Sequence, residues 1–69
     1  MDIYLLDQSH VYHFQAKEND NFYYVTIHTD KKSDFTVWEV SDKHGGKIKG
    51  PLESEMINKI RLDWKRLVK

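Results

Sequence analysis

The sequence predicts an α+β domain in which an antiparallel meander of three or four strands packs one face against a single C-terminal α-helix. Segments rich in aromatic and β-branched residues alternate with polar turns as far as residue 42. Two turns, placed independently, give strand registers that gather apolar residues on one common face. In the C-terminal segment, after residue 50, apolar residues recur at three- and four-residue spacing. We expect one domain over residues 1–69, with strands over 2–6, 10–17, 22–29 and 35–41 and a helix over 51–68.

The first expected strand contains Ile3–Leu6 and joins the next strand through a short turn at Asp7–Ser9. Because side chains alternate across a strand, this turn would place Tyr4 and Leu6 on the core face. Ile3 and Leu5 would then lie on the other face. The same segment could instead wrap around an edge of the sheet.

The second and third strands form a hairpin if residues 19–20 are a two-residue turn, which makes Glu18 face Asn21. Alternation then puts three facing pairs on one side of the sheet: Tyr12 with Ile27, Phe14 with Val25, and Ala16 with Tyr23. The opposite side receives mixed residues, as a half-buried antiparallel pair requires.

The fourth strand follows from a four-residue loop over residues 30–33. On the same face, this loop pairs Val25 with Trp38, Tyr23 with Val40, and Ile27 with Thr36. Trp38 is thereby expected in the core. Trp38→Ala is expected to cost about 3–5 kcal/mol of folding free energy, as the truncation of a buried aromatic side chain.

The helix is predicted to begin at Gly50-Pro51, because proline is tolerated at a first helical position whose N–H has no intrahelical partner. Leu62 falls opposite the apolar stripe and is expected to be exposed. Docking of the stripe should stabilise a sheet that would be marginal alone. The stripe has Leu52 at its margin and contains Met56, Ile57, Ile60, Trp64, Leu67 and Val68.

Composition excludes several classes of function. The 69 residues contain no cysteine, which excludes disulfides, thiolate nucleophiles and thiolate zinc sites. The formal net charge is zero, so the chain lacks the overall basic charge that favours nucleic acid or membrane surfaces. No apolar run has transmembrane length, and the N-terminal residues lack the features of a signal peptide. We therefore expect a cytoplasmic protein that does not bind membranes.

No catalytic, metal or cofactor site is predicted, and we expect a protein that is not an enzyme. Motifs of the GxSxG and HExxH kinds are absent. His10 and His13 are three residues apart and therefore lie on opposite faces of a strand. His13 and His28 share a face, but two plausible ligands are too few for a zinc shell.

One helix can cover only one face of the sheet, so the opposite face is the candidate site. This open face is expected to present apolar anchors among polar groups, a pattern typical of protein-binding or dimerisation surfaces. Two other interpretations stay open: scattered exposed apolar residues are common on sheets, and residues 43–50 could fold over this face. The predicted protein-binding residues are Val11, His13, Tyr24, His28, Phe35, Val37 and Glu39.

A second candidate site is the lysine- and glycine-rich segment over residues 43–50, whose glycine amides could approach a phosphate. The segment does not match a P-loop. We favour a Gly-Gly turn in which residues 47–49 form a short strand whose lysines protect an edge. The alternative nucleic-acid-binding residues are Lys31, Lys32, Lys43, Lys47 and Lys49.

These observations favour a non-catalytic protein-binding module, such as an accessory factor, inhibitor or regulator, that docks through the open sheet face. Phe35→Ser is expected to weaken binding while leaving the fold intact. Closure of a homodimer through this face or an edge strand is compatible with the same pattern. Nucleic-acid binding through the lysines is the alternative, and it predicts an affinity that falls steeply with salt.

Overall fold

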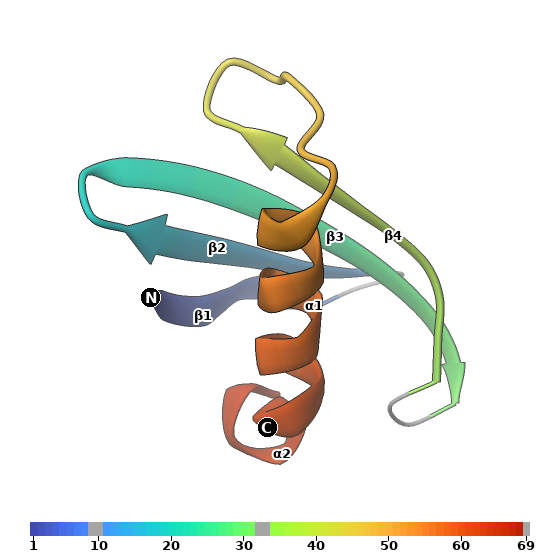
Figure 1. Ribbon diagram of the computed structural model, residues 1–69. Helices are drawn as coiled ribbons and strands as arrows, with labels where there is room; N and C mark the ends of the chain where they lie inside the picture. Colours follow the sequence, from blue (N-terminus) through green and yellow to red (C-terminus); the bar gives the residue numbers. More distant parts are fainter. Residues whose placement is uncertain (9–10, 32–33, 69) are drawn as a thin grey trace.

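Four strands form one antiparallel sheet with helices on one of its faces (Figure 1). The computed structural model describes residues 1–8, 11–31 and 34–68, and the side chains of residues 30, 31 and 34–37 lie outside this description. The predicted fold class is confirmed. The strands are β1 (Asp2–Gln8), β2 (Tyr12–Glu18), β3 (Asn21–Lys31) and β4 (Asp34–Asp42), in the order β1-β2-β3-β4, and the helices are α1 (Pro51–Leu62) and α2 (Trp64–Leu67).

The central hairpin has the predicted register. Glu18 faces Asn21 across a two-residue turn, and Asn19 in that turn has a φ of 57°. Asparagine tolerates this left-handed conformation better than most residues, which suits it to a tight hairpin. The core-facing pairs are those expected: Tyr12 with Ile27, Phe14 with Val25, and Ala16 with Tyr23.

The register between β3 and β4 differs from the prediction by two residues. Val25 faces Val40 and Ile27 faces Trp38, rather than Trp38 and Thr36. The reason is the length of the connection: pairing continues to Lys31 and Asp34, so two residues, and not four, separate the paired ends. Because side chains alternate with a period of two, a shift of two keeps each residue on its predicted face.

The predicted faces of β1 are wrong. A β-bulge shifts the register between Leu5 and Asp7, so that Ile3 faces Ala16 and Leu5 faces Phe14. Ile3 and Leu5 therefore pack against the core, whereas Tyr4 and Leu6 are about half exposed. A bulge inserts one extra residue, and a shift of one exchanges the two faces of a strand.

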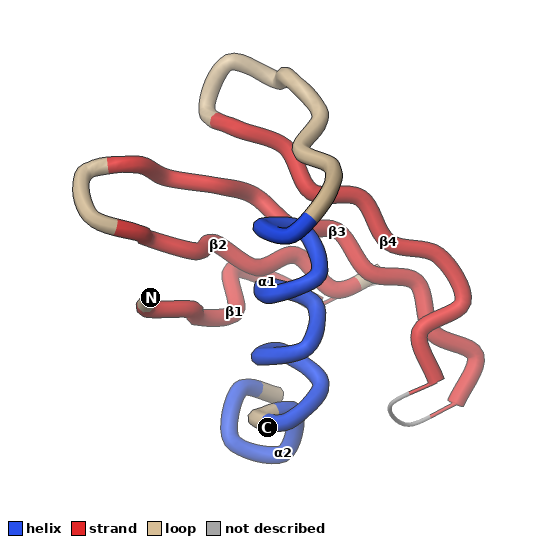
Figure 2. Tube along the Cα trace, viewed as in Figure 1, coloured by secondary structure: helices blue, strands red, loops and turns tan. Residues whose placement is uncertain are grey.

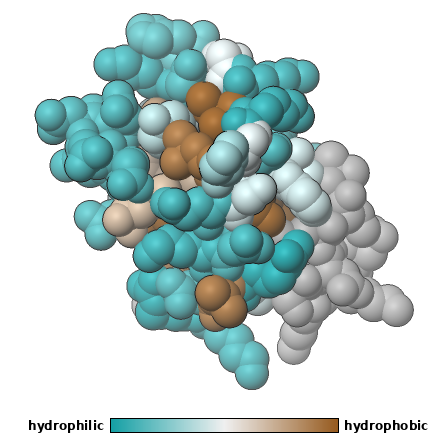
Figure 3. Space-filling model, viewed as in Figure 1, coloured by the Kyte–Doolittle hydropathy of each residue, from teal (hydrophilic) through white to brown (hydrophobic). Residues whose placement is uncertain are grey.

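The hydrophobic core lies between the sheet and the helices. Each buried sheet residue belongs to the face on which α1 lies, so the buried contacts of the fold lie on the helix side of the sheet. Figure 3 shows the outer surface of this side, where hydrophilic residues predominate and hydrophobic ones form small areas. The buried residues are Phe14, Ala16, Val25, Ile27 and Val40 from the sheet and Met56, Ile57, Ile60 and Leu67 from the helices.

The C-terminal segment forms two helices rather than the one predicted over residues 51–68. The backbone turns at Asp63, whose carbonyl accepts the amide N–H groups of Arg66 and Leu67 at 2.9 Å each. The Arg66 guanidinium also lies 2.9 Å from Asp63 Oδ2. Figure 2 shows α2 as a separate turn after α1. Leu62, at the end of α1, is 85% exposed, as predicted.

The turn at Asp63 lets α2 complete the predicted apolar stripe. The Trp64 ring lies edge-on to Tyr12 with 4.9 Å between centroids, and 5.9 Å from the centroid of Phe14. Leu67, one turn later, is buried in the core. Aromatic pairs at these separations add about 0.5–1.5 kcal/mol to the gain from area burial. The short α2 is therefore held by its packing on β2.

Trp38 lies on the predicted face but is not buried. It belongs to β4, the edge strand next to β3, and its side chain is 38% exposed. The expected loss of about 3–5 kcal/mol on Trp38→Ala applies to a fully buried aromatic side chain, so the loss should fall below that range. The exposure of Trp38 also leaves an apolar surface on the helix side.

Candidate functional site

Both described helices lie on one face of the sheet, so the opposite face keeps its exposed side chains. The strand registers arrange this open face in rows that cross the strands. One row runs Tyr4, Gln15, Tyr24 and Ser41, and the next runs Asp7, His13, Thr26 and Glu39. Residues 43–50 extend beyond the end of β4 and lead to α1 (Figure 1), so they do not form a lid over these rows.

The first row carries the two exposed tyrosines of the sheet face. Tyr4 is 46% exposed and Tyr24 is 39% exposed, and Gln15 lies between them. The Tyr4 hydroxyl donates to Gln15 Oε1 at 2.8 Å, which fixes the phenol ring of Tyr4 over β2. Tyrosines held in this way offer apolar area and a polar tip at little entropic cost, and they are enriched at protein interfaces.

The second row is polar. His13 Nδ1 and Thr26 Oγ1 lie 3.4 Å apart, and His13 is half-buried. Glu39 lies in the same row and forms an ion pair with Lys47 at 3.7 Å between two largely exposed side chains. Among the described residues, no three histidine, aspartate or glutamate side chains are grouped so that they could hold a metal ion.

The predicted site residues are thus brought onto one face only in part. His13, Tyr24 and Glu39 share it, and exposed His28 is paired with Val37 across β3 and β4. Val11 is half-buried and precedes β2. Phe35 faces Thr29, next to two register shifts. The side chains of Phe35 and Val37 lie outside the described residues, so their part in the site stays a prediction.

Sequence reasoning missed Tyr4 because it assigned that residue to the core. It also gave little weight to Lys17 and Phe22, which face each other at the end of the open face. The Lys17 ammonium lies 5.8 Å from the centroid of the Phe22 ring, a cation–π distance. The hairpin register contained the signal for this second pair, since it places Lys17 opposite Phe22.

The lysine-rich segment is organised around Asp42 rather than around an anion. The amide N–H groups of His44 and Gly46 both donate to Asp42 Oδ1 at 2.8 Å. A side chain at position 46 would place its Cβ 2.8 Å from Asp42 Oδ2, so the Asp42 carboxylate would have to shift to admit one. The amides of His44 and Gly46 are therefore bonded to a carboxylate of this chain, and the Gly45 amide donates to the Asp42 carbonyl at 3.1 Å.

Two lysines of this segment are also paired. Lys47 is paired with Glu39, and Lys49 lies 4.0 Å from Glu53. Lys47 also forms an isolated antiparallel bridge with Ser41, next to a hydrogen bond from the Ile48 amide to the Val40 carbonyl at 2.8 Å. Lys43 is exposed, the Lys31 side chain and the whole of Lys32 lie outside the described residues, and the nucleic-acid alternative remains a prediction with less support.

The pKa of Asp42 gives a pH test of this turn. The amide hydrogen bonds from Gly46 and His44 lower the pKa of the Asp42 carboxyl below its ordinary value of 3.8. A lowered pKa in the folded state means that the carboxylate stabilises the turn fully above pH 3.8 and ceases to do so as pH falls through the folded value.

We expect the amide proton shifts of His44 and Gly46 to change together below pH 3.8 when the protein is titrated by NMR. Asp42→Asn should abolish this transition. A transition midpoint at or above 3.8 would contradict the geometry. The low pKa also makes Asp42 a poor general base, although a shallow pocket of about 270 Å³ lies beside it.

None of the helices among the described residues is long and apolar enough to cross a membrane. Comparison of the chain with protein-family models, with curated proteins and with solved structures finds no match.

Proposed function

We propose that the protein is a non-catalytic protein-binding module, an accessory factor, inhibitor or regulator, that docks through the open face of its sheet. The row of exposed Tyr4 and Tyr24 joined through Gln15 carries this proposal. These tyrosines lie away from the core, so the burial of apolar area does not account for their position. Interface energy concentrates in a few aromatic residues at the centre of a contact.

The charges around the tyrosines indicate the kind of partner. On this face Asp2 faces Lys17, and Glu39 is paired with Lys47, so acidic and basic groups largely compensate. A face of this kind suits a folded protein surface of low net charge that can hydrogen-bond the two phenols. Binding to such a partner should depend only weakly on salt, in contrast to binding through phosphate contacts.

Tyr24→Ser is expected to weaken partner binding at least about tenfold, because it removes a ring from the centre of the face. The partner would be the protein that the tagged wild type recovers from nuclease-treated lysate, and its affinity would then be measured by calorimetry with purified proteins. Leu62→Ser is the control, since Leu62 is an exposed apolar residue on α1, away from the open face.

The control variant should bind like the wild type at both low and physiological salt. Unchanged affinity of Tyr24→Ser would contradict the proposal, provided that its circular dichroism matches the wild type. Recovery that disappears on nuclease treatment would instead support the lysine alternative.

A further inference from the structure

A pocket of about 270 Å³ lies between the start of β3 and the turn that follows β4. The last paired residues of these strands are Tyr23 and Asp42, and β3 begins beyond this point, where the chain turns away toward α1 (Figure 1). Sites for drug-sized ligands occupy about 300–1,000 Å³, so this pocket suits a smaller molecule. Its lining residues include Phe22, Tyr23, Asp42, Lys43, His44 and Ile48.

The pocket presents a negative and a positive group at neighbouring positions. The amides of Gly46 and His44 donate to Asp42 Oδ1 and lower the pKa of this carboxyl, so it is ionised at neutral pH. A carboxylate accepts hydrogen bonds at both oxygens, so Oδ2 can accept from a ligand. Lys43 is exposed, and within the described part of the chain no ion pair joins it to a carboxylate.

An apolar surface lies beside these charges. Tyr23 and Ile48 both line the pocket, and both are half-buried and pack against the hydrophobic core. The Ile48 amide donates to the Val40 carbonyl at 2.8 Å, which holds this part of the segment against β4. Tyr23 and Ile48 therefore offer a contact surface to the apolar side chain of a small ligand.

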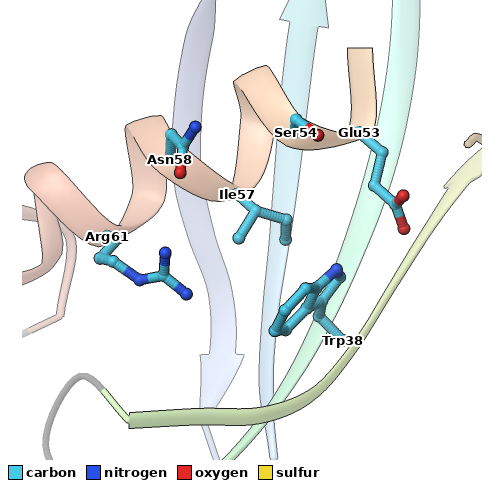
Figure 4. Close-up of a pocket in the computed structure, with 6 residues that line it drawn as sticks. All are labelled: Trp38, Glu53, Ser54, Ile57, Asn58 and Arg61. Carbon is cyan, nitrogen blue, oxygen red and sulfur yellow. The ribbon is translucent and has the colours of Figure 1, made fainter. Parts of the chain in front are cut away.

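The pocket between Trp38 and α1 lacks this combination of charges. It has a volume of about 150 Å³, and Figure 4 shows Glu53 and Arg61 among its lining residues. Glu53 lies 4.0 Å from the Lys49 ammonium, and Arg61 already interacts within the chain. The charges of that pocket are thus engaged by the protein itself, whereas Asp42 is bonded to neutral amides.

We propose that the pocket at Asp42 binds a zwitterionic α-amino acid with an aliphatic side chain. Its ammonium group donates to Asp42 Oδ2, its carboxylate accepts from the Lys43 ammonium, and its side chain lies on Tyr23 and Ile48. Asp42 would repel an anion and Lys43 would repel a cation, whereas a zwitterion is attracted by both residues. The proposal goes beyond the proposed function, because the ligand is a small molecule and binds at the end of the sheet.

The test is a titration of the isotope-labelled full chain with L-leucine, followed by NMR. The amide signals of residues 22–23 and 42–44 should shift together and saturate, with a dissociation constant of about 1 mM or below. Three other ligands each lack one group of leucine: N-acetyl-leucine lacks the ammonium, isopentylamine lacks the carboxylate, and glycine lacks the side chain. Each should bind at least about tenfold more weakly than L-leucine.

Two lysine variants locate the carboxylate of the ligand. Lys43→Gln should weaken the binding of L-leucine about tenfold without weakening that of isopentylamine, which has no carboxylate to lose. Lys47→Gln is the matched control, because it removes the same charge from the same segment outside the pocket, and it should bind L-leucine like the wild type. Asp42→Asn keeps an oxygen for the two amide hydrogen bonds but loses the negative charge, and it should abolish binding.

Three outcomes would overturn the proposal: no saturating shift with L-leucine, equal affinity for the ligands that lack one group, or equal losses in the two lysine variants. Tyr24→Ser should leave the binding of L-leucine unchanged. Failure of this site and failure of the open face are therefore distinguishable.

Discussion

Phe14→Ala is expected to remove a large part of the stability of the fold. Phe14 is completely buried, faces Val25 and Leu5 on the two neighbouring strands, and contacts Trp64 of α2. Truncating such a side chain costs about 3–5 kcal/mol. A domain of this length has a total stability of about 3–10 kcal/mol, at about 0.05–0.15 kcal/mol per residue. The single substitution therefore removes much or all of the available stability.

Urea denaturation followed by tryptophan fluorescence would measure this loss. Phe22→Ala is the matched control, because Phe22 lies on the open face and is half-buried. It should retain a cooperative transition with a clearly smaller loss of unfolding free energy. Equal losses in the two variants would mean that the core does not lie on the helix side.

Ile60→Ala is expected to cost about 2–5 kcal/mol, because it leaves a cavity where α1 docks on the sheet. Ile60 is completely buried, whereas Leu62, two residues later on the same helix, is 85% exposed. Leu62→Ala should therefore change stability by no more than about 0.5 kcal/mol. Both variants shorten an aliphatic side chain to alanine at neighbouring positions of α1.

Comparison of the Ile60 and Leu62 variants separates the contribution of helix docking to stability from that of helix propensity. Thermal unfolding followed by far-ultraviolet circular dichroism would compare the two variants. Similar midpoints would contradict the docking of α1 through Ile60. A sheet without its helix would be only marginally stable, so the Ile60 variant should lose strand and helix signals together.

The central hairpin and the helix stripe could be predicted from sequence because local chemistry determines both. A two-residue turn at residues 19–20 leaves one register for β2 and β3, and the apolar spacing leaves one face for α1. The bulge in β1 has no such local signal. One inserted residue moved Tyr4 from the predicted core to the open face, and with it one of the two tyrosines of the candidate site.

The position of Trp38 could not be predicted for a different reason. Alternation gives the face of a residue, but burial also depends on how far the helix reaches across the sheet. α1 leaves the side chain of Trp38 on the edge strand partly exposed, and residues 47–48 pair with β4 only at Val40 and Ser41. The reach of α1 across the sheet and the pairing of residues 47–48 with β4 are both long-range features of the assembled fold. The organisation of the turn around Asp42 followed only from the structure.

The bulge in β1 also makes the two edges of the sheet differ in how readily they can pair with an additional strand. Between Leu5 and Asp7 the ladder is interrupted, and bulges at an edge hinder the addition of another strand. From Val37 to Asp42, β4 pairs with β3 without a shift, but residues 46–48 already bond to its outer edge at Val40 and Asp42. Among the described residues, the regular open edge of β4 is therefore the short stretch before Val40. A molecule with one edge that can pair with another strand has a single joining site. It can form a closed pair with one partner, but it cannot propagate a fibre, which needs two joining ends per molecule.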